Sequence, residues 1–331
     1  MKRIFFFILL IFFVFIVACT PYKKISTETI EPARINVPAE VNKIGFMFSE
    51  PTGKFAVDNT NKLKLQINEE LKRGIADIAA ASPRFRLSSL HVLNDSELTK
   101  NVPENQYPKR KINRMANDSL DAIIVLHSFH LKDSLDEEIV FDNRNYYYYL
   151  FNLKSKALWR FYVPTSKDFV IDVFNYSEKF AWESIDYTKQ KALNKLPDYS
   201  KTYHQAAYWT AVDYLKRIAP LWKSEERIIF DRGNKLFKQA YEAFQNKNWE
   251  KAILLWKKNK GHEDNELSSR ALHNIAVTSE LMGRIDIALT WAKKSYKVKP
   301  KPRTKEYIQR LKERQSDVKK LEKQMPYGLP D

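Results

Sequence analysis

The alternation of apolar and polar residues divides the chain into a strand-rich first part and a helical second part. Apolar residues at every second position over 146–176 predict an antiparallel meander, and a short β-branched run at 121–126 predicts a buried strand. A three-to-four-residue spacing predicts a helix over 62–81 with one apolar face: Leu63, Ile67, Leu71, Ile75 and Ile78. A second long helix is expected from residue 200 to about 218. Residues 32–230 therefore predict an α+β domain, with helices packed on a mostly antiparallel sheet.

The pattern changes at Gly233, where two stretches of helical spacing align with each other at an offset of 36 residues. The aligned positions are Leu236, Ala240, Trp249, Ala252 and Trp256 against Leu272, Ala276, Ile285, Ala288 and Ala292. This pattern resembles the tetratricopeptide repeat, a helix pair of about 34 residues. The resemblance implies two repeats over 231–300. Because two repeats leave an apolar end uncovered, residues 301–331 are expected to supply a capping helix and a tail.

The first nineteen residues have the three parts of an export signal. Met1-Lys2-Arg3 precedes an apolar run over 4–18, and Cys19 follows the small residue Ala18. Fifteen residues rise about 22 Å as a helix, short of the roughly 30 Å of a bilayer core, which favours removal over retention as an anchor. The pattern resembles a bacterial lipoprotein signal. That resemblance implies cleavage after Ala18 and a diacylglyceryl thioether on Cys19, with acyl chains such as palmitate; an ordinary secretory signal and an uncleaved anchor are the alternatives.

A lipidated amino terminus predicts a place in the cell envelope. Residues 19–31 are polar and unpatterned and predict a tether that holds the folded body near the outer membrane. Among the bacterial lipoproteins that this chain resembles, those bound for the cell surface often carry acidic residues just after the lipidated cysteine. The basic Lys23 and Lys24 instead favour the periplasmic side.

The amino-acid composition excludes several kinds of functional site and partner. Cys19 is the one cysteine, so no intrachain disulfide and no cysteine-built zinc or iron–sulfur site can form. The net charge is +16, or +14 after loss of the signal, which favours anionic surroundings such as lipopolysaccharide phosphates or acidic glycans. Export argues against nucleic acid as a partner. The seven glycines are too widely spaced for a phosphate-binding loop, which excludes the common nucleotide-binding motifs.

Motifs for catalysis or metal binding are missing from the sequence. It has no Gly-x-Ser-x-Gly elbow, no His-Glu-x-x-His helix and no free cysteine nucleophile. His127 and His130 are three apart on a predicted strand and therefore point to opposite faces, which suits chelation poorly. We therefore expect no metal, no cofactor and no enzymatic activity, although a pair of carboxylates assembled by the fold leaves an envelope hydrolase as a third hypothesis.

Two surfaces are candidates for binding. If the helical repeats stack as in the tetratricopeptide family, the first helix of each repeat lines a concave groove suited to an acidic or extended peptide. Its residues would be Asn234, Phe237, Lys238, Tyr241, Arg270, His273 and Asn274. The tyrosine run from Tyr146 to Tyr149 is the second candidate, as a stacking platform for a glycan. For both surfaces a purely structural role is the competing interpretation.

Short patterns also give a resemblance over nearly the whole chain. The lipoprotein signal, the Trp159-Arg160-Phe161-Tyr162 stretch and Ala219-Pro220-Leu221-Trp222 resemble an uncharacterised family of Bacteroidota lipoproteins, which implies no particular activity. The function we expect is a lipid-anchored, non-enzymatic envelope protein that holds a protein partner through its repeat module. A glycan- or cell-wall-binding lipoprotein is the alternative.

Overall fold

The computed structural model describes residues 22–48, 52–54, 60–85, 90–93, 120–164, 166, 169–325 and 328. They fall into two compact units. The sheet unit runs from Ile30 to Trp222 and takes in the chain from Lys320 onward. The helical unit comprises Lys223–Lys319 and the described residues before Ile30. Cys19 and the export signal lie outside the described residues.

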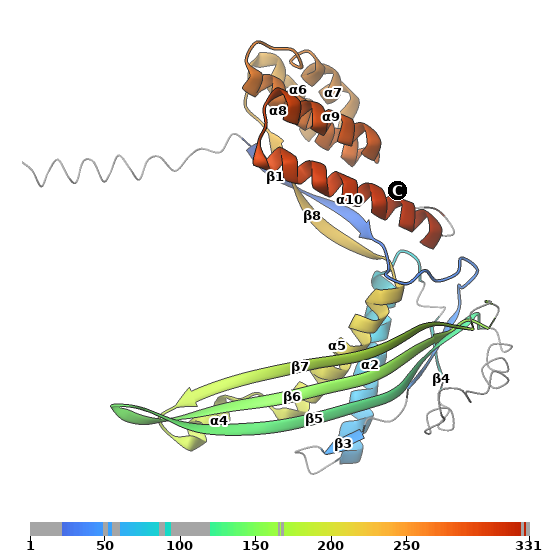
Figure 1. The fold of residues 1–331 in the computed structure, drawn as a ribbon, viewed down its shortest axis with the longest axis vertical. Helices are drawn as coiled ribbons and strands as arrows, with labels where there is room; N and C mark the ends of the chain where they lie inside the picture. Colours follow the sequence, from blue (N-terminus) through green and yellow to red (C-terminus); the bar gives the residue numbers. More distant parts are fainter. Residues whose placement is uncertain are drawn as a thin grey trace, which may run out of the picture. The chain divides into compact units, whose positions relative to one another are not determined.

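The sheet unit is built on a mixed sheet in the order β4-β2-β5-β6-β7, with β3 on the side of β5 (Figure 1). The strands are β2 (Ile44–Phe48), β3 (Thr52–Lys54), β4 (Leu90–Leu93), β5 (Ala122–Asp142), β6 (Arg144–Tyr162) and β7 (Val170–Asp186). The short strands pair in parallel, whereas the three long ones form an antiparallel meander. The predicted α+β class and mostly antiparallel sheet are confirmed.

Helices cover one face of this sheet (Figure 1): α2 (Thr60–Ala81), α4 (Lys189–Lys195) and α5 (Tyr199–Ile218). The predicted apolar stripe of α2 packs into the core. Trp159 of β6 stacks on Tyr214 of α5 with ring centroids 4.6 Å apart. A Cβ at Gly74 would lie 2.7 Å from the carbonyl oxygen of Tyr208, so only glycine lets α2 and α5 approach this closely.

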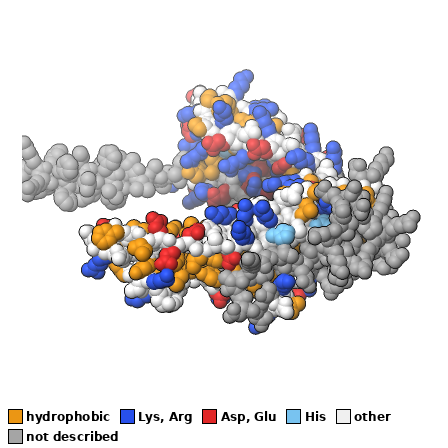
Figure 2. Space-filling model, turned by 60° about the horizontal axis from the view of Figure 1, so that its bottom comes forward, with side chains coloured by type: hydrophobic (Ala, Val, Ile, Leu, Met, Phe, Trp, Pro, Cys, Tyr) orange, Lys and Arg blue, Asp and Glu red, His pale blue; other side chains and the backbone are white. Residues whose placement is uncertain are grey.

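The distal halves of β5, β6 and β7 form an extended arm (Figure 1). The β5–β6 turn at Asn143 has a φ of 56°, a left-handed conformation that asparagine tolerates. Several apolar side chains near this turn are exposed, including Ile139 and Phe141, at 57% and 75%. Figure 2 shows apolar and charged side chains mixed over the arm's surface.

The helical unit contains a two-stranded sheet and a run of helices. β1 (Tyr22–Glu31) pairs with β8 (Leu221–Phe230), and the helices are α6 (Lys235–Gln245), α7 (Trp249–Lys257), α8 (Asn265–Leu281), α9 (Ile285–Val298) and α10 (Pro302–Gln324). The aligned small residues Ala240, Ala252, Ala276 and Ala288 are all fully buried, and they let neighbouring helices pack closely. Tyr307 and Leu311 of α10 join the same core.

Two predictions about domain organisation need correction. The tether predicted over 19–31 is wrong for Tyr22–Glu31, which is a strand, because β8 supplies the backbone partners that its polar sequence did not reveal. The boundary predicted at residue 230 also moves. Strand β8 belongs mainly to the helical unit, whereas the end of α10 from Lys320 onward belongs to the sheet unit, within which Gln324 exchanges two hydrogen bonds with the backbone of Ala33. No described helix is long and apolar enough to cross a membrane.

Candidate functional site

The predicted peptide groove is mostly occupied by side chains with structural roles. Asn234 caps α6, because its Oδ1 accepts a hydrogen bond from the Phe237 N–H at 2.9 Å. Phe237 is fully buried against Trp256. Lys238 is exposed, and Tyr241 is half-buried with a pKa raised by burial and by the charge of Asp231. Of these four predicted residues, Phe237 is enclosed, whereas Asn234, Lys238 and Tyr241 reach the surface, Asn234 with its side chain engaged in the cap.

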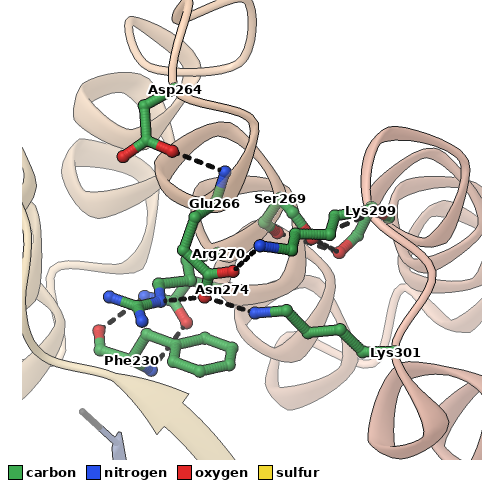
Figure 3. A network of polar contacts seen from close by, with 9 residues as sticks. Phe230, Asp264, Glu266, Ser269, Arg270, Asn274, Lys299 and Lys301 are labelled. Atoms are coloured by element: carbon green, nitrogen blue, oxygen red, sulfur yellow. Dashed lines mark hydrogen bonds and ion pairs between the residues drawn. The ribbon is translucent and has the colours of Figure 1, made fainter.

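Asn274 is fully buried and holds the end of β8. Its Oδ1 accepts from the Phe230 N–H at 2.8 Å, and its Nδ2 donates to the Phe230 carbonyl at 2.7 Å (Figure 3). The amide therefore satisfies both backbone groups of Phe230, as a neighbouring strand would. The prediction that Asn274 contacts a partner is wrong, because every polar atom of this side chain that could do so is enclosed.

Arg270 belongs to a charged network centred on Glu266 (Figure 3). Glu266 accepts from Arg270 at 2.7 Å, from Lys299 at 2.9 Å and from Lys301. Burial alone would raise the pKa of Glu266, but hydrogen bonds from the two lysines lower it to about 2. This carboxylate joins α8 to the segment between α9 and α10. Arg270 is thus a partner of Glu266 and not an open cationic site.

A cavity of about 270 Å³ lies elsewhere in the helical unit, between the β1–β8 sheet and helices α8 and α10. Its lining combines aromatic and charged side chains: Tyr22, Lys24, Glu226, Arg227, Ile228, His273, Arg303, Glu306, Tyr307 and Arg310. His273 is the one residue of the predicted groove that borders it. The size suits a side chain or a small polar group rather than a whole drug-sized ligand.

A buried ion pair forms the floor of this cavity. Arg227 is 3% exposed, and its Nε and one terminal nitrogen donate to the two oxygens of Glu280, while Glu225 accepts from the same terminal nitrogen at 2.6 Å. Tyr307 donates its hydroxyl to Glu280 at 2.8 Å. Burial alone would lower the pKa of Arg227, but Glu280 and Glu225 raise it overall, so the guanidinium stays charged. The floor is therefore a fixed, fully paired charge cluster.

His273 is enclosed beside this floor, at 1% exposure. Its Nε2 lies 3.2 Å from the carbonyl oxygen of Ile228, which can only accept, so the proton sits on Nε2. Nδ1 is buried without a hydrogen-bond partner. Burial lowers the pKa of His273 to about 4, which keeps the imidazole neutral at neutral pH. The prediction that His273 meets a partner as part of an open groove is wrong.

Unlike the buried Arg227, the cations at the rim of the cavity are exposed. Arg303 lies over the Tyr22 ring at 4.5 Å, and Lys24 pairs with Glu226 at 2.7 Å on the exposed surface. Neither Arg303 nor Arg310 forms an ion pair with a described residue. They lie seven residues apart on α10, two helical turns along one face, with Tyr307 between them. Two exposed guanidinium groups thus border a cavity whose floor is already neutralised.

The sequence patterns do not reveal this rim, because it depends on where strand β1 lies. The helical spacing of α10 is compatible with a buried Tyr307 and an exposed Arg310, as the structure has them, but it does not show what lies beside them. The missing information was that β1 lies against this helix, because Tyr22 belonged to a supposed tether. The signal that could have found it is the β-branched Ile25, Thr27 and Thr29 at alternate positions, which is typical of a strand.

The predicted tyrosine platform and the predicted strand histidines lie in the sheet unit. Tyr149 is buried at 1%, and Tyr147 packs against the same core, so the run cannot act as one platform. Tyr146 and Tyr148 are half-exposed on the opposite face. His127 lies 3.0 Å from the Tyr162 hydroxyl, at a bulge between Leu126 and Ser128. Among the described residues, no group of three or more side chains is placed to hold a metal ion.

Comparison with known proteins gives families without an assigned function. Residues 85–230 match the domain of unknown function DUF8603, and residues 238–313 match the domain of unknown function DUF6340. Neither description names a tetratricopeptide repeat or a bacterial group, so those two assignments stay predictions. No curated protein matches the chain.

Several solved structures are similar at low identity. A Helicobacter pylori protein, described as a homologue of a neuraminyllactose-binding hemagglutinin, has 11% identity and a TM-score of 0.33, covering 56% of this chain and 89% of its own. A hypothetical protein of Chlamydia trachomatis has 9% identity and a TM-score of 0.27, covering 53% and 96%. A minor lipoprotein of Acinetobacter baumannii has 6% identity and a TM-score of 0.20, covering 53% and 89%.

These TM-scores are too low to carry an argument about function, although similar structures do include proteins described as lipoproteins. The chain thus combines two regions that match families of unknown function, one within the sheet unit and β8, the other within the helices.

Proposed function

We propose that the protein is a lipid-anchored component of the cell envelope that binds an acidic segment of a partner protein, without catalysis. The anchor is Cys19, at the end of a lipoprotein-like signal, and the outer membrane with a periplasm-facing body is the location that the basic Lys23 and Lys24 favour. The helical pairs α6–α7 and α8–α9, which resemble tetratricopeptide repeats, serve as the framework.

The observation that carries this proposal is the rim of the cavity. Arg303 and Arg310 are exposed and make no ion pair with any described residue, whereas Arg227 and Arg270 are both neutralised by carboxylates. Guanidinium groups bind carboxylates in a two-pronged geometry, and the neighbouring Tyr22 offers an aromatic surface for the attached apolar groups. Glu306 lies between the two arginines and offsets one of their charges, so an acidic side chain inserted there would find one excess positive charge at the mouth and a rigid floor beneath it.

The test measures capture of envelope proteins by the purified full chain in detergent. The Arg303→Glu/Arg310→Glu variant should lose its specific partners. Lys293→Glu/Lys297→Glu changes the charge by the same amount on exposed positions of α9 and should retain them. Equal capture by both variants would rule out the cavity rim as the binding site.

A glycan-binding role rests on a separate observation. The Tyr146 and Tyr187 rings are 4.7 Å apart near the end of the arm, and the Tyr148 hydroxyl donates to Glu183 at 2.9 Å on the same face. Exposed aromatic rings beside a carboxylate are compatible with a sugar-stacking surface. A glycan array on which wild type and Tyr146→Ala/Tyr148→Ala bind equally, or not at all, would remove this candidate.

A further inference from the structure

The face of the sheet opposite the helices carries three lysines in one row. Lys132 of β5 is directly opposite Lys154 of β6, and Lys154 is directly opposite Lys179 of β7. Residues directly opposite in antiparallel strands share a face, so the three ammonium groups lie side by side. All three side chains are exposed, and none forms an ion pair with a described residue. Like charges in this arrangement destabilise a sheet unless something else neutralises them.

The same face carries acidic residues a short distance toward the end of the arm. Asp136 of β5 and Glu183 of β7 lie four residues along their strands from Lys132 and Lys179, in the row that also contains Leu150 of β6. Four residues of strand correspond to about 13 Å. One face therefore has a positive and a negative row at a fixed separation.

The residues between these rows are small or neutral. The intermediate row consists of Ser134, Asn152 and Ala181, one from each strand. If two copies of this face meet with their strands running in opposite directions, a two-fold axis along this row brings each lysine row over the partner's acidic row. Lys132 then faces the partner's Asp136, Lys179 faces the partner's Glu183, and Lys154 lies over the partner's Leu150.

We propose that this face is the interface of a symmetric homodimer. A two-fold axis makes every contact occur twice, so the pairing gives four intermolecular ion pairs. Three strands spaced about 4.8 Å apart, over about twelve residues, give a face of about 14 by 40 Å, or about 1,100 Å² for both copies. That area lies at the lower end of specific interfaces, as expected for a weak dimer whose orientation is set by charge.

A second copy is a better occupant than an extended polyanion. A polyanion long enough to cover the lysine row and continue along the arm would meet Asp136, Glu138 and Glu183, and would be repelled. A copy of the same chain satisfies both rows at once. The exposed Ile185, in the row next to Glu183, adds apolar area to the same interface.

The test uses a short bis-maleimide cross-linker on the full chain, expressed in cells, because facing sheets lie about 10 Å apart and a direct disulfide needs Cα atoms within about 7 Å. Cys19 is the chain's one cysteine, so an introduced cysteine adds a single further thiol. Ala181→Cys lies on the expected axis, opposite its symmetry mate, and should give a cross-linked dimer on a denaturing gel. Ala80→Cys is the matched control: Ala80 is exposed on α2, away from this face, and should give none. A dimer linked through Cys19 would appear in both variants and in wild type.

Charge-reversal variants then distinguish a specific dimer from copies of the chain that are linked during random collisions. In the Ala181→Cys background, Lys132→Glu/Lys179→Glu should weaken dimerisation about 30-fold, which corresponds to about 2 kcal/mol, and so should Asp136→Lys/Glu183→Lys. Combining all four reversals restores opposite charges across the axis and should restore the linked dimer. Raising the salt concentration from 0.15 to 1 M should weaken the wild-type dimer.

The proposal is overturned by either of two results. One is a linked fraction that does not respond to the lysine reversals or is not recovered by the four-residue swap. The other is a monomeric wild type, by analytical ultracentrifugation in detergent, whose lysine variants lose binding to vesicles of anionic phospholipid. In that case the lysine row serves an anionic surface.

Discussion

The enclosed His273 makes the stability of the helical unit depend on pH. Burial lowers its pKa from about 6.5 to about 4, and Nδ1 has no partner that would favour protonation. The unfolded chain therefore binds a proton at higher pH than the folded chain does, so stability falls as pH falls through the range from 6.5 to 4. Between pH 7 and pH 5 these two values give a loss of about 2 kcal/mol. That is a large fraction of a typical domain's stability.

The measurement should be local, because the sheet unit contains a half-buried histidine of its own, His127, whose pKa burial lowers to about 3. Hydrogen exchange followed by mass spectrometry of peptides from α8 and α10 reports on the helical unit alone. His273→Gln keeps an N–H donor for the Ile228 carbonyl but does not titrate. Comparing wild type with this variant at the same pH cancels the pH dependence of the chemical exchange rate.

The expected result is that the opening free energies of wild type and His273→Gln approach each other, or reverse their order, by about 2 kcal/mol between pH 7 and pH 5. His262→Gln, at an exposed position in the same unit, should follow wild type at both values. If the difference between wild type and His273→Gln is the same at pH 7 and pH 5, the reasoning from burial is refuted.

Two further predictions concern packing. Arg227→Met should destabilise the helical unit by about 3–5 kcal/mol, because it leaves the Glu280 carboxylate buried without its main partner, and Arg227→Met/Glu280→Leu should recover most of that loss in urea denaturation. A double variant as unstable as the single one would contradict this account. Gly74→Ala should cost about 1–3 kcal/mol in thermal unfolding, because its Cβ meets the Tyr208 carbonyl, whereas Gly261→Ala meets nothing. Equal melting temperatures for these two variants would show that α2 and α5 can move apart.

Elements with strong periodicity were predictable from the sequence. The helix expected over 62–81 is α2, and the alanines aligned between the two helix pairs are all buried. The strand expected at 121–126 exists but continues to Asp142, because the charged residues after Leu131 extend a ladder whose other members are on β6. A long ribbon with few buried side chains has a weak hydrophobic signal, and its hydrogen bonds are not visible in the sequence.

The candidate site was less predictable, because burial depends on contacts far along the chain. Asn274 and His273 look like surface residues of a repeat, yet they contact Phe230 and Ile228 of β8, which lie 44 and 45 positions earlier in the chain. The lysine row has the same origin. Lys132, Lys154 and Lys179 become neighbours only through the registers of β5, β6 and β7, which local patterns do not fix.

If Cys19 carries a lipid anchor, the position of β1 limits the distance between that anchor and the first strand. Strand β1 begins at Tyr22, three residues after Cys19, and three extended residues span at most about 11 Å. If acyl chains on Cys19 hold the protein in a bilayer, this limit of about 11 Å keeps the Tyr22 side of the cavity close to the lipid headgroups. A partner that reaches Arg303 would then approach along the membrane surface, where both molecules diffuse in two dimensions.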